Sequence, residues 1–477
     1  MKRWFPSNLI VGSLIAVCSF LFSGVAVSDT VYVDPSGSAD FTTIQAAIDD
    51  AGTDTGDIVI VQPCTYVENI NLSGKSIILR SSDPTNPSVV ATTIIDGNAS
   101  DRVITCNSGE DPNTVISGFT VTNGKGGMYN ENSSSPTITY CTFTENMATA
   151  GGGMYNNNSS PIITRCTFSK NTTDRTDNGY GGGIYNANGS SPVITHCTFT
   201  ENTFSIDSSR GGGMHNKEST PAISHCTFSK NAAYQAGGMY NESCPPFTIT
   251  NCTFVGNKAS DINGFGGGMN NVYSSVNISH CTFIANTANS GGGIRNFSSL
   301  PVVENCVFSS NRANGVLGSG GGMYNYNYSS PTVTNCTFSS NTAKYRGGGM
   351  YNNESDPNVI DCTFTQNRTE NDGGAGIFNF GSSATTITRC AFIANSAGIH
   401  GGGVESSYSF VPKVSVADCH FCYNLPQAIY NSYLDAGGNH LNYCSPPSPF
   451  IDGDIDGDGD VDMIDFSLLA GNWLAGT

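Results

Sequence analysis

The chain has 477 residues, 56 of them glycine, and its 38 acidic and 20 basic residues give a formal net charge of −18 at pH 7. A surface of that sign repels the phosphate backbone, which excludes nucleic acid as a partner. Length alone predicts several globular domains, but a regular internal repeat favours one long domain, because a solenoid lengthens without enlarging its core.

Residues 1–28 have the features of a secretory signal peptide. Lys2 and Arg3 precede an apolar run from Leu9 to Val27, and Ala26-Val27-Ser28 supplies a small-x-small ending. The alternative is a membrane anchor, which the Ser and Gly residues within the run disfavour. We therefore expect an exported protein, either secreted or held at the cell surface.

Residues 29–444 are expected to form one β-helix that begins with a cap. Residues 39–51 carry Phe41, Ile44, Ala47 and Ile48 at helical spacing, and a strand is expected over residues 57–62. A helix at this point would cover the strand edges that the end of a solenoid leaves unpaired.

This opening resembles that of the right-handed parallel β-helix (pectate-lyase-like) superfamily, in which a short amphipathic helix closes the first coil. Gln45-Ala46-Ala47-Ile48 and Tyr66-Val67-Glu68 are also similar to the opening of pectin methylesterases. The later Asp-containing catalytic motifs of that family have no counterpart in the sequence. Residues 76–124 are expected to form irregular first coils.

From residue 126 to about residue 424 a repeat recurs, with a glycine-rich start, an apolar residue and then Cys-x-Phe-x-x-Asn. Ten steps from Cys141 to Cys419 cover 278 residues, a period of about 28 that is typical of solenoids. Each copy has three short β-rich pieces, exemplified by GMYN, PIIT and CTF, and no helical apolar period. The sequence therefore predicts an all-β parallel helix with three strands in each coil.

Strand parity predicts which positions face the core. The residue after the glycines is always apolar, the Phe of each copy recurs from Phe143 to Phe421, and the Cys two positions before that Phe has the same parity. The residue before the Cys is rich in Asn, Asp and His, which favours a left-handed bend. Two Asn ladders, Asn130 to Asn379 and Asn146 to Asn424, are expected at turn corners.

The same repeats resemble the GGA and FxxN repeats of polymorphic outer-membrane proteins, which are surface-exposed β-helices. About 300 residues share that pattern, and the resemblance implies display at a cell surface. The sequence contains 17 Cys, which in an exported protein suggests disulfides. Eleven of them are ladder positions, however, and these are expected to be small buried hydrophobes.

The C-terminal residues carry the most specific motif. Residues 445–451 are a Pro-rich linker, and residues 452–477 are expected to form an EF-hand-like calcium module. Carboxylates occupy loop positions 1, 3, 5, 9 and 12 of an EF-hand-type loop, with Gly459 at position 6 and an apolar residue at position 8. The predicted calcium ligands are Asp454, Asp456, Asp458, Asp460, Asp462 and Asp465. The segment resembles one repeat of a type I dockerin, which implies calcium as cofactor and a cohesin-like partner, although dockerins normally have two repeats.

An outward stripe of aromatic residues beside the apolar ladder suggests glycan binding. Its tyrosines could stack on successive sugars of an extended polysaccharide, and the alternative is that Tyr simply favours strands. The candidate glycan-binding residues are Tyr129, Tyr155, Tyr185, Tyr240, Tyr324 and Tyr351.

The longest insertions offer a possible catalytic site, because pectate-lyase-like enzymes use clustered acidic calcium ligands with a basic residue. These insertions contain Asp174, Arg175, Asp177, Asp207, Arg210 and Asp261. No motif identifies catalytic residues among them. Two functions therefore remain open: an exported β-helix that binds or adheres to polysaccharide, and a polysaccharide lyase or glycoside hydrolase.

Overall fold

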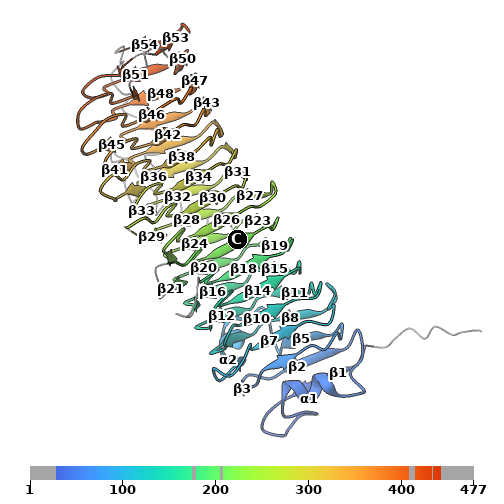
Figure 1. The fold of residues 1–477 in the computed structure, drawn as a ribbon. Helices are drawn as coiled ribbons and strands as arrows, with labels where there is room; N and C mark the ends of the chain where they lie inside the picture. The colour runs from blue at the N-terminus through green and yellow to red at the C-terminus, as the bar shows by residue number, and fades with distance from the viewer. Residues whose placement is uncertain are drawn as a thin grey trace, which may run out of the picture.

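The computed structural model describes residues 28–173, 179–204, 208–260, 262–407, 414–431 and 433–441. Within them the chain winds into a parallel β-solenoid, and three sheets run along its length (Figure 1). Each coil passes through sheet C, then sheet A, then sheet B, as the strand numbering shows.

Sheet A has 16 strands, each paired in parallel with the next coil. Its strands are β1 Thr30–Val33, β2 Ile58–Val61, β5 Ile78–Ser81, β8 Val115–Ser117, β11 Thr137–Thr139, β15 Ile162–Thr164, β19 Val193–Thr195, β23 Ala222–Ser224, β27 Thr248–Thr250, β31 Asn277–Ser279, β35 Val302–Glu304, β39 Thr332–Thr334, β43 Asn358–Ile360, β47 Thr386–Thr388, β50 Ser415–Ala417 and β53 Leu434–Asp435.

Sheet B has 15 strands and contains the Phe ladder. Its strands are β3 Thr65–Val67, β6 Ile94–Asp96, β9 Thr120–Thr122, β12 Thr142–Thr144, β16 Thr167–Ser169, β20 Thr198–Thr200, β24 Thr227–Ser229, β28 Thr253–Val255, β32 Thr282–Ile284, β36 Val307–Ser309, β40 Thr337–Ser339, β44 Thr363–Thr365, β48 Ala391–Ile393, β51 His420–Cys422 and β54 His440–Leu441.

Sheet C has 14 strands and follows the glycine runs. Its strands are β4 Ile70–Asn71, β7 Ile104–Cys106, β10 Met128–Asn130, β14 Met154–Asn157, β18 Ile184–Ala187, β22 Met214–Lys217, β26 Met239–Glu242, β30 Met269–Val272, β34 Ile294–Phe297, β38 Met323–Tyr326, β42 Met350–Asn353, β46 Ile377–Phe380, β49 Val404–Ser406 and β52 Ile429–Tyr430.

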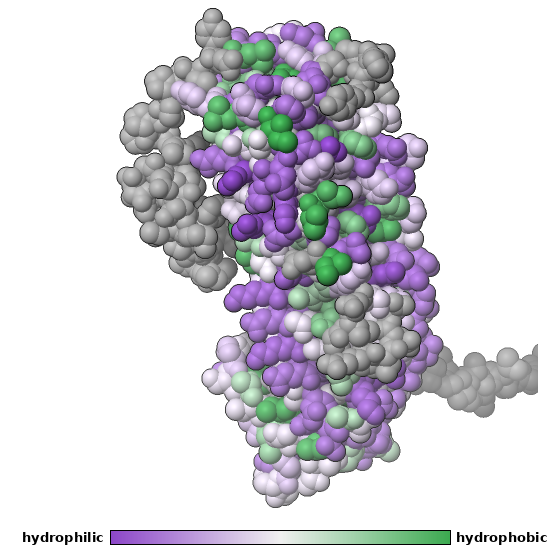
Figure 2. All heavy atoms as spheres, turned by 60° about the vertical axis from the view of Figure 1, so that its left-hand side comes forward, coloured by the Kyte–Doolittle hydropathy of each residue, from purple (hydrophilic) through white to green (hydrophobic). Residues whose placement is uncertain are grey.

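A fourth, two-residue strand follows sheet B in the regular coils, which the sequence did not predict. These strands form a three-stranded and a six-stranded sheet on one flank of the solenoid (Figure 1). Figure 2 shows hydrophobic side chains scattered among hydrophilic ones on this side of the molecule. They are β13 Met147–Ala148, β17 Thr172–Thr173, β21 Thr203–Phe204, β25 Ala232–Ala233, β29 Lys258–Ala259, β33 Thr287–Ala288, β37 Arg312–Ala313, β41 Thr342–Ala343 and β45 Arg368–Thr369.

The predicted cap is helix α1, Ile44–Asp49, which buries Ile44, Ala47 and Ile48. The helix is shorter than predicted because Thr43 caps its start and the backbone turns to an extended conformation at Asp50. Glu68 accepts hydrogen bonds from the backbone N–H groups of Ile44 and Gln45, both at 2.9 Å. A carboxylate at a helix N-terminus satisfies unpaired donors and complements the dipole, which explains why the two opening motifs occur together.

Helix α2, Pro87–Thr92, lies among coils that were expected to be irregular. Asn86 caps it by accepting from the backbone N–H of Ser88, and Pro87 stands at the first helical turn. Asn followed by Pro is a helix-start pattern that the sequence analysis missed.

The inward ladders are confirmed. The apolar residues after the glycines, from Met128 to Val404, are at most 1% exposed, and the Phe residues from Phe143 to Phe421 are fully buried. Successive rings stack with centroids 4.5–5.0 Å apart and planes within 7°. A core of this kind grows one rung at a time, since each coil buries its side chains on the next.

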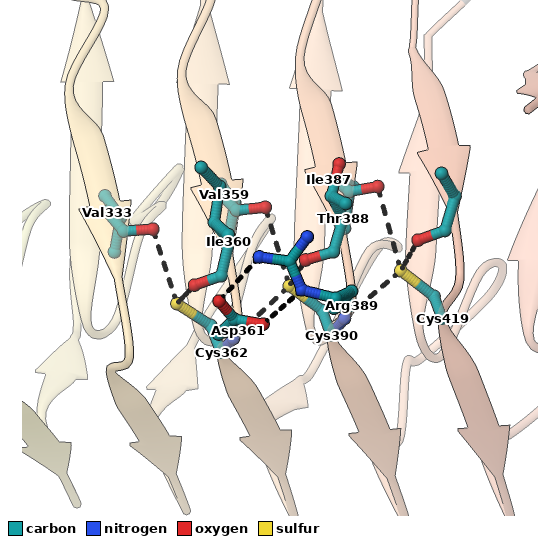
Figure 3. Close-up of polar contacts among 11 residues, drawn as sticks. Val333, Val359, Ile360, Asp361, Cys362, Ile387, Thr388, Arg389, Cys390 and Cys419 are labelled. Carbon is teal, nitrogen blue, oxygen red and sulfur yellow. Dashed lines mark hydrogen bonds and ion pairs between the residues drawn. The ribbon is translucent and has the colours of Figure 1, made fainter.

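The ladder cysteines are buried free thiols, as predicted. Cys362 donates to the carbonyl oxygens of Ile360 and Val333, at 3.1 and 3.5 Å. Equivalent contacts between a cysteine Sγ and backbone carbonyl oxygens recur in the following coils (Figure 3). The hydrogen bond with Cys336, together with burial, raises the pKa of the Cys362 thiol to about 12. The Cys362 thiol therefore remains protonated near neutral pH.

The two Asn ladders differ in position. The ladder from Asn146 to Asn424 lies at a corner, as expected. From Asn171 to Asn395 each side-chain amide donates to the next Asn and to a Phe carbonyl oxygen, as in Asn171 to Asn202 and Phe143, while Asn146 donates to the carbonyl oxygen of Val121. The ladder from Asn130 to Asn379 was also expected at a corner, but its members lie within sheet C and point inward. The corner prediction is wrong there because the strands extend one residue further, and amide-to-amide bonds of 2.8–2.9 Å join successive buried side chains.

The left-handed bend before each ladder Cys is confirmed, with φ between 51° and 55° from Tyr140 to Asp418. A second left-handed corner precedes the corner Asn ladder, where Glu145, Lys170 and Ala285 have φ of 57°, 53° and 52°. These residue types do not favour that conformation, so the second corner could not be predicted from residue identity.

Candidate functional site

The outer face of sheet C carries three parallel rows of side chains. The middle row is the outward position next to the apolar ladder, and equivalent residues are paired from coil to coil. The front row precedes each glycine run and includes Tyr180, Arg210, Gln235, Phe265 and Arg346. The rear row is the fourth strand residue, namely Asn157, Ala187, Lys217, Glu242, Val272, Phe297, Tyr326, Asn353 and Phe380.

The six candidate glycan-binding tyrosines all lie in the middle row, and the expectation that they form an exposed stripe is wrong for half of them. Tyr185, Tyr240 and Tyr351 are buried, with 8%, 6% and 6% of their surface exposed. Tyr129, Tyr155 and Tyr324 are partly buried. The front and rear rows lie on either side of the middle row. The contribution of the six tyrosines to glycan binding stays a prediction.

The middle row stacks on itself along the solenoid axis. Ring centroids are 5.0 Å apart for Tyr155 and Tyr185, and 5.2 Å apart for Tyr324 and Tyr351. His215 continues the row, 5.0 Å from Tyr185 and from Tyr240. The buried rings of this row therefore lie beneath the side chains of the two outer rows.

Around His215 the face carries a charged cluster. Glu242 lies 3.4 Å from Nε2 of His215 and 3.0 Å from Arg210, and these neighbours lower the pKa of its carboxyl to about 2. Burial lowers the pKa of His215 to about 4. Near neutral pH the cluster is therefore an Arg210–Glu242 ion pair beside a neutral imidazole.

Arg295 occupies the next hollow along the face, which we call the Arg295 hollow, with a volume of about 300 Å³. Its guanidinium lies 4.2 Å from the ring centroid of Phe265 and 5.0 Å from that of Phe297. Within the described residues no carboxylate pairs with it, and its Nε has no hydrogen-bond partner. The hollow is lined by Ser208, Arg210, Tyr234, Gln235, Tyr240, Phe265, Val272, Arg295 and Phe297.

A third cluster follows around Arg346. Its Nε lies 2.6 Å from Asp372, and its guanidinium lies 4.5 and 4.7 Å from the ring centroids of Tyr345 and Phe378. Glu405 is 5% exposed, its Oε2 has no hydrogen-bond partner, and burial followed by the charge of Asp372 raises its pKa to about 7.

Cations with aromatic neighbours thus recur along one face of an acidic protein. At the N-terminal part of the face, Arg102 lies 4.0 Å from the ring centroid of Tyr129, in a second hollow of about 480 Å³ that also includes Lys125 and Tyr155. Of the nine arginine–ring contacts among the described residues, eight belong to this face, and the other joins Arg165 to Tyr140. Arginine over an aromatic ring is a common arrangement in polar recognition surfaces.

Most other predicted site residues lie outside the described residues. This is true of the calcium loop, Asp454 to Asp465, and of Asp174, Arg175, Asp177, Asp207 and Asp261 in the insertions. Arg210 is described, and among the described residues it pairs with Glu242. The described part of the chain has no group of three His, Cys, Asp or Glu residues placed to hold a metal ion.

The sequence analysis missed Glu242, Phe297 and Arg346 as members of one face. The available signal was their fixed offset from the glycine runs, since residues at equal offsets in successive coils lie side by side. Among the described residues, no helix is long and apolar enough to span a bilayer.

Several known proteins are similar to this chain. The curated "Cell surface glycoprotein" of Methanothermus fervidus is 40% identical over 110 residues, which is 23% of this chain and 16% of that protein. The match therefore spans a small part of the relative's length.

Among solved structures, a mannuronic acid specific polysaccharide family 6 lyase from human gut microbiota matches at 12% identity and a TM-score of 0.42, covering 82% of this chain and 86% of that one. The A-module of the Azotobacter vinelandii mannuronan C-5 epimerase AlgE6 matches at 13% identity and a TM-score of 0.33, covering 85% and 95%.

The family model described as "Right handed beta helix region" matches residues 31–203, 102–283, 178–320 and 268–442, which together span most of the chain. These matches coincide with the stacked coils of sheets A, B and C. The chain belongs to the right handed beta helix family.

Proposed function

We propose that this protein is an exported, surface-associated β-helix that binds polysaccharide along the outer face of sheet C. The observation that carries the proposal is the alternation of arginines and aromatic rings along the three rows of that face. Parallel strands repeat about every 4.8 Å, so the face offers a long series of equivalent contacts. An extended polymer of similar units is the ligand that matches such a series.

The rings of the outer rows are the ones available for stacking on sugars. Phe380 is 38% exposed, and Phe297, Tyr326 and Tyr180 are partly exposed. Aromatic rings bury large areas at low conformational cost. Arginines beside them supply hydrogen-bond donors for hydroxyl and acidic groups.

Two observations support the surface location. Residues 1–28 have the features of a signal peptide, and a curated relative of part of the chain is a cell surface glycoprotein. The net charge of −18 disfavours nucleic acid.

Binding to immobilised polysaccharides tests the proposal. The double variant Phe297→Ala/Tyr326→Ala should weaken binding by roughly tenfold or more, because each lost stacking contact costs about 1 kcal/mol. Tyr32→Ala is the matched control, since Tyr32 is an exposed strand tyrosine on sheet A. Equal losses in both variants, or binding unchanged by the double substitution, would reject this face as the binding site.

A second candidate function is hydrolysis of the bound polymer, and Glu405 favours it. A carboxyl with a pKa of about 7 is suited to act as a general acid, and Asp372 supplies a second carboxylate nearby. New reducing ends from neutral polysaccharides, abolished in Glu405→Gln, would support this function; unsaturated products would indicate a lyase instead.

The C-terminal module remains a proposal supported by sequence spacing alone. We propose that Asp454, Asp456, Asp458, Asp460, Asp462 and Asp465 bind calcium, and that the ordered module docks onto a cohesin-like partner. This arrangement would attach the polysaccharide-binding face to a larger surface assembly.

A further inference from the structure

Three arginines on the outer face of sheet C differ in what balances their charge. Arg210 lies 3.0 Å from Glu242, and Arg346 lies 2.6 Å from Asp372. Arg295, by contrast, has no carboxylate partner among the described residues, although its side chain is partly buried and burial lowers its pKa. A desolvated cation without a partner is costly, so its retention points to a partner that comes from outside the chain.

The protein contacts of Arg295 hold it in place without neutralising it. Two aromatic rings contact the guanidinium, and its one hydrogen bond within the described residues runs from Nη1 to the Asn270 side chain at 3.5 Å. Its Nε has no acceptor. The planar donor edge of a guanidinium matches two oxygens of a carboxylate or a sulfate group.

The Arg295 hollow has the charge of an anion site. Among the described residues its lining contains two arginines, Arg210 and Arg295, and no Asp or Glu. Its volume of about 300 Å³ lies at the lower end of the range for small-ligand sites. Tyr234, Tyr240 and Phe297 add ring surface beside the cations, which suits a sugar unit with an acidic substituent.

We propose that the Arg295 hollow is an anion subsite that takes a carboxylate or sulfate ester carried by the bound glycan. The proposal rests on the proposed function, because the glycan chain brings the anion to this face. Arg295 pairs with the acidic group through its guanidinium, and Arg210 contributes a second cation while it remains paired with Glu242. The subsite therefore selects acidic over neutral polysaccharides.

The test measures binding of the full chain to two pairs of polymers by calorimetry. One pair is polygalacturonate and its methyl-esterified form, and the other is carrageenan and the unsulfated galactan agarose. The wild-type protein should bind the acidic member of at least one pair about tenfold more tightly than the neutral member, as a charge-assisted bidentate contact allows. The pair that shows the preference distinguishes a carboxylate from a sulfate ester.

Arg295→Gln should abolish the preference, and Arg295→Lys should restore only part of it, because an ammonium group lacks the bidentate donor geometry. Arg165→Gln is the matched control, since it removes one arginine–ring contact on another face. Circular dichroism establishes whether each variant folds. If Arg295→Gln does not fold, the polymer preference of Arg295→Lys tests the subsite instead.

Two results overturn the subsite, and they separate it from the proposed function. If the wild-type protein binds acidic and neutral polymers equally, or if Arg295→Gln keeps the preference, polysaccharide binding stands and the anion subsite fails. If none of the four polymers binds, both proposals fail.

Discussion

Nε2 of His215 lies 3.4 Å from Oε2 of Glu242, yet neither ring nitrogen of His215 has a hydrogen-bond partner. The imidazole is fully buried between Tyr185 and Tyr240, as a neutral member of the middle row. Its pKa of about 4 lies below the ordinary value of about 6.5.

This relationship predicts a pH dependence of stability. Below pH 6.5 the unfolded chain binds a proton at His215 that the folded chain excludes. The stability that the neutral His215 contributes is therefore lost as the pH falls from 6.5 towards 4. The free energy of unfolding should decrease by about 1–2 kcal/mol between pH 6.5 and 5 from this group. His215→Phe should remove that decrease in urea titrations, and Tyr185→Phe, which keeps the imidazole, should not. Identical pH profiles for wild type and His215→Phe would contradict the assignment.

Glu405 predicts a dependence of the opposite sign. Its pKa is about 7 in the fold and about 4.3 in an unfolded chain. The fold therefore favours the protonated form, and stability from this group is full below about pH 4 and is lost as the pH rises through 7. Glu405→Gln should be more stable than wild type at pH 8 by on the order of 2 kcal/mol. No gain at pH 8 relative to pH 4 in urea titrations would show that Glu405 is not held neutral.

Ile294 tests the apolar ladder of sheet C. The residue is fully buried, so Ile294→Asp places an unpaired charge in the core and should destabilise the middle coils by several kcal/mol. Thr248→Asp adds the same charge at an exposed position on sheet A and should change stability little. Equal melting temperatures for Ile294→Asp and wild type would contradict the inward assignment.

The rows of the outer face predict different effects for two tyrosines. Tyr185 is 8% exposed and stacked, so Tyr185→Ala should lower the free energy of unfolding by about 3 kcal/mol. Tyr326 in the rear row is partly exposed, so Tyr326→Ala should weaken polysaccharide binding with a much smaller stability loss. Chemical denaturation and binding measured on the same samples separate the two effects. A larger stability loss for Tyr326→Ala than for Tyr185→Ala would contradict the row assignment.

The calcium module makes a spectroscopic prediction. Trp4 lies in the predicted signal peptide, which leaves Trp473 as the tryptophan of the mature chain. Calcium should order residues 454–474 by compensating carboxylates that repel one another, and Trp473 fluorescence should change on titration. Asp458→Ala should abolish the change. A flat titration of the wild-type protein would mean that the acidic segment does not bind calcium.

The sequence by itself determined the solenoid. Strict recurrence of the apolar residue, Cys, Phe and Asn at fixed offsets specified the stacked ladders, because equal offsets in successive coils must lie one above the other. It also determined the capping helix and the first left-handed corner, where Asn, Asp and His favour the required backbone. The second corner was hidden, since residues such as Glu145 and Lys170 adopt it only because the Asn ladder beside them fixes the turn.

The tertiary structure decided the character of the outer face. Parity placed Tyr185 and Tyr240 outside the coil, but their burial depends on front-row residues such as Tyr180, which sit at the end of insertions of variable length. Whether an arginine on this face has a carboxylate partner depends likewise on which rear-row residue lies in the neighbouring coil. Arg210 has such a partner, and among the described residues Arg295 has none. Charge balance is a property of three-dimensional neighbours, and the repeat fixes the positions of those neighbours without fixing their identities.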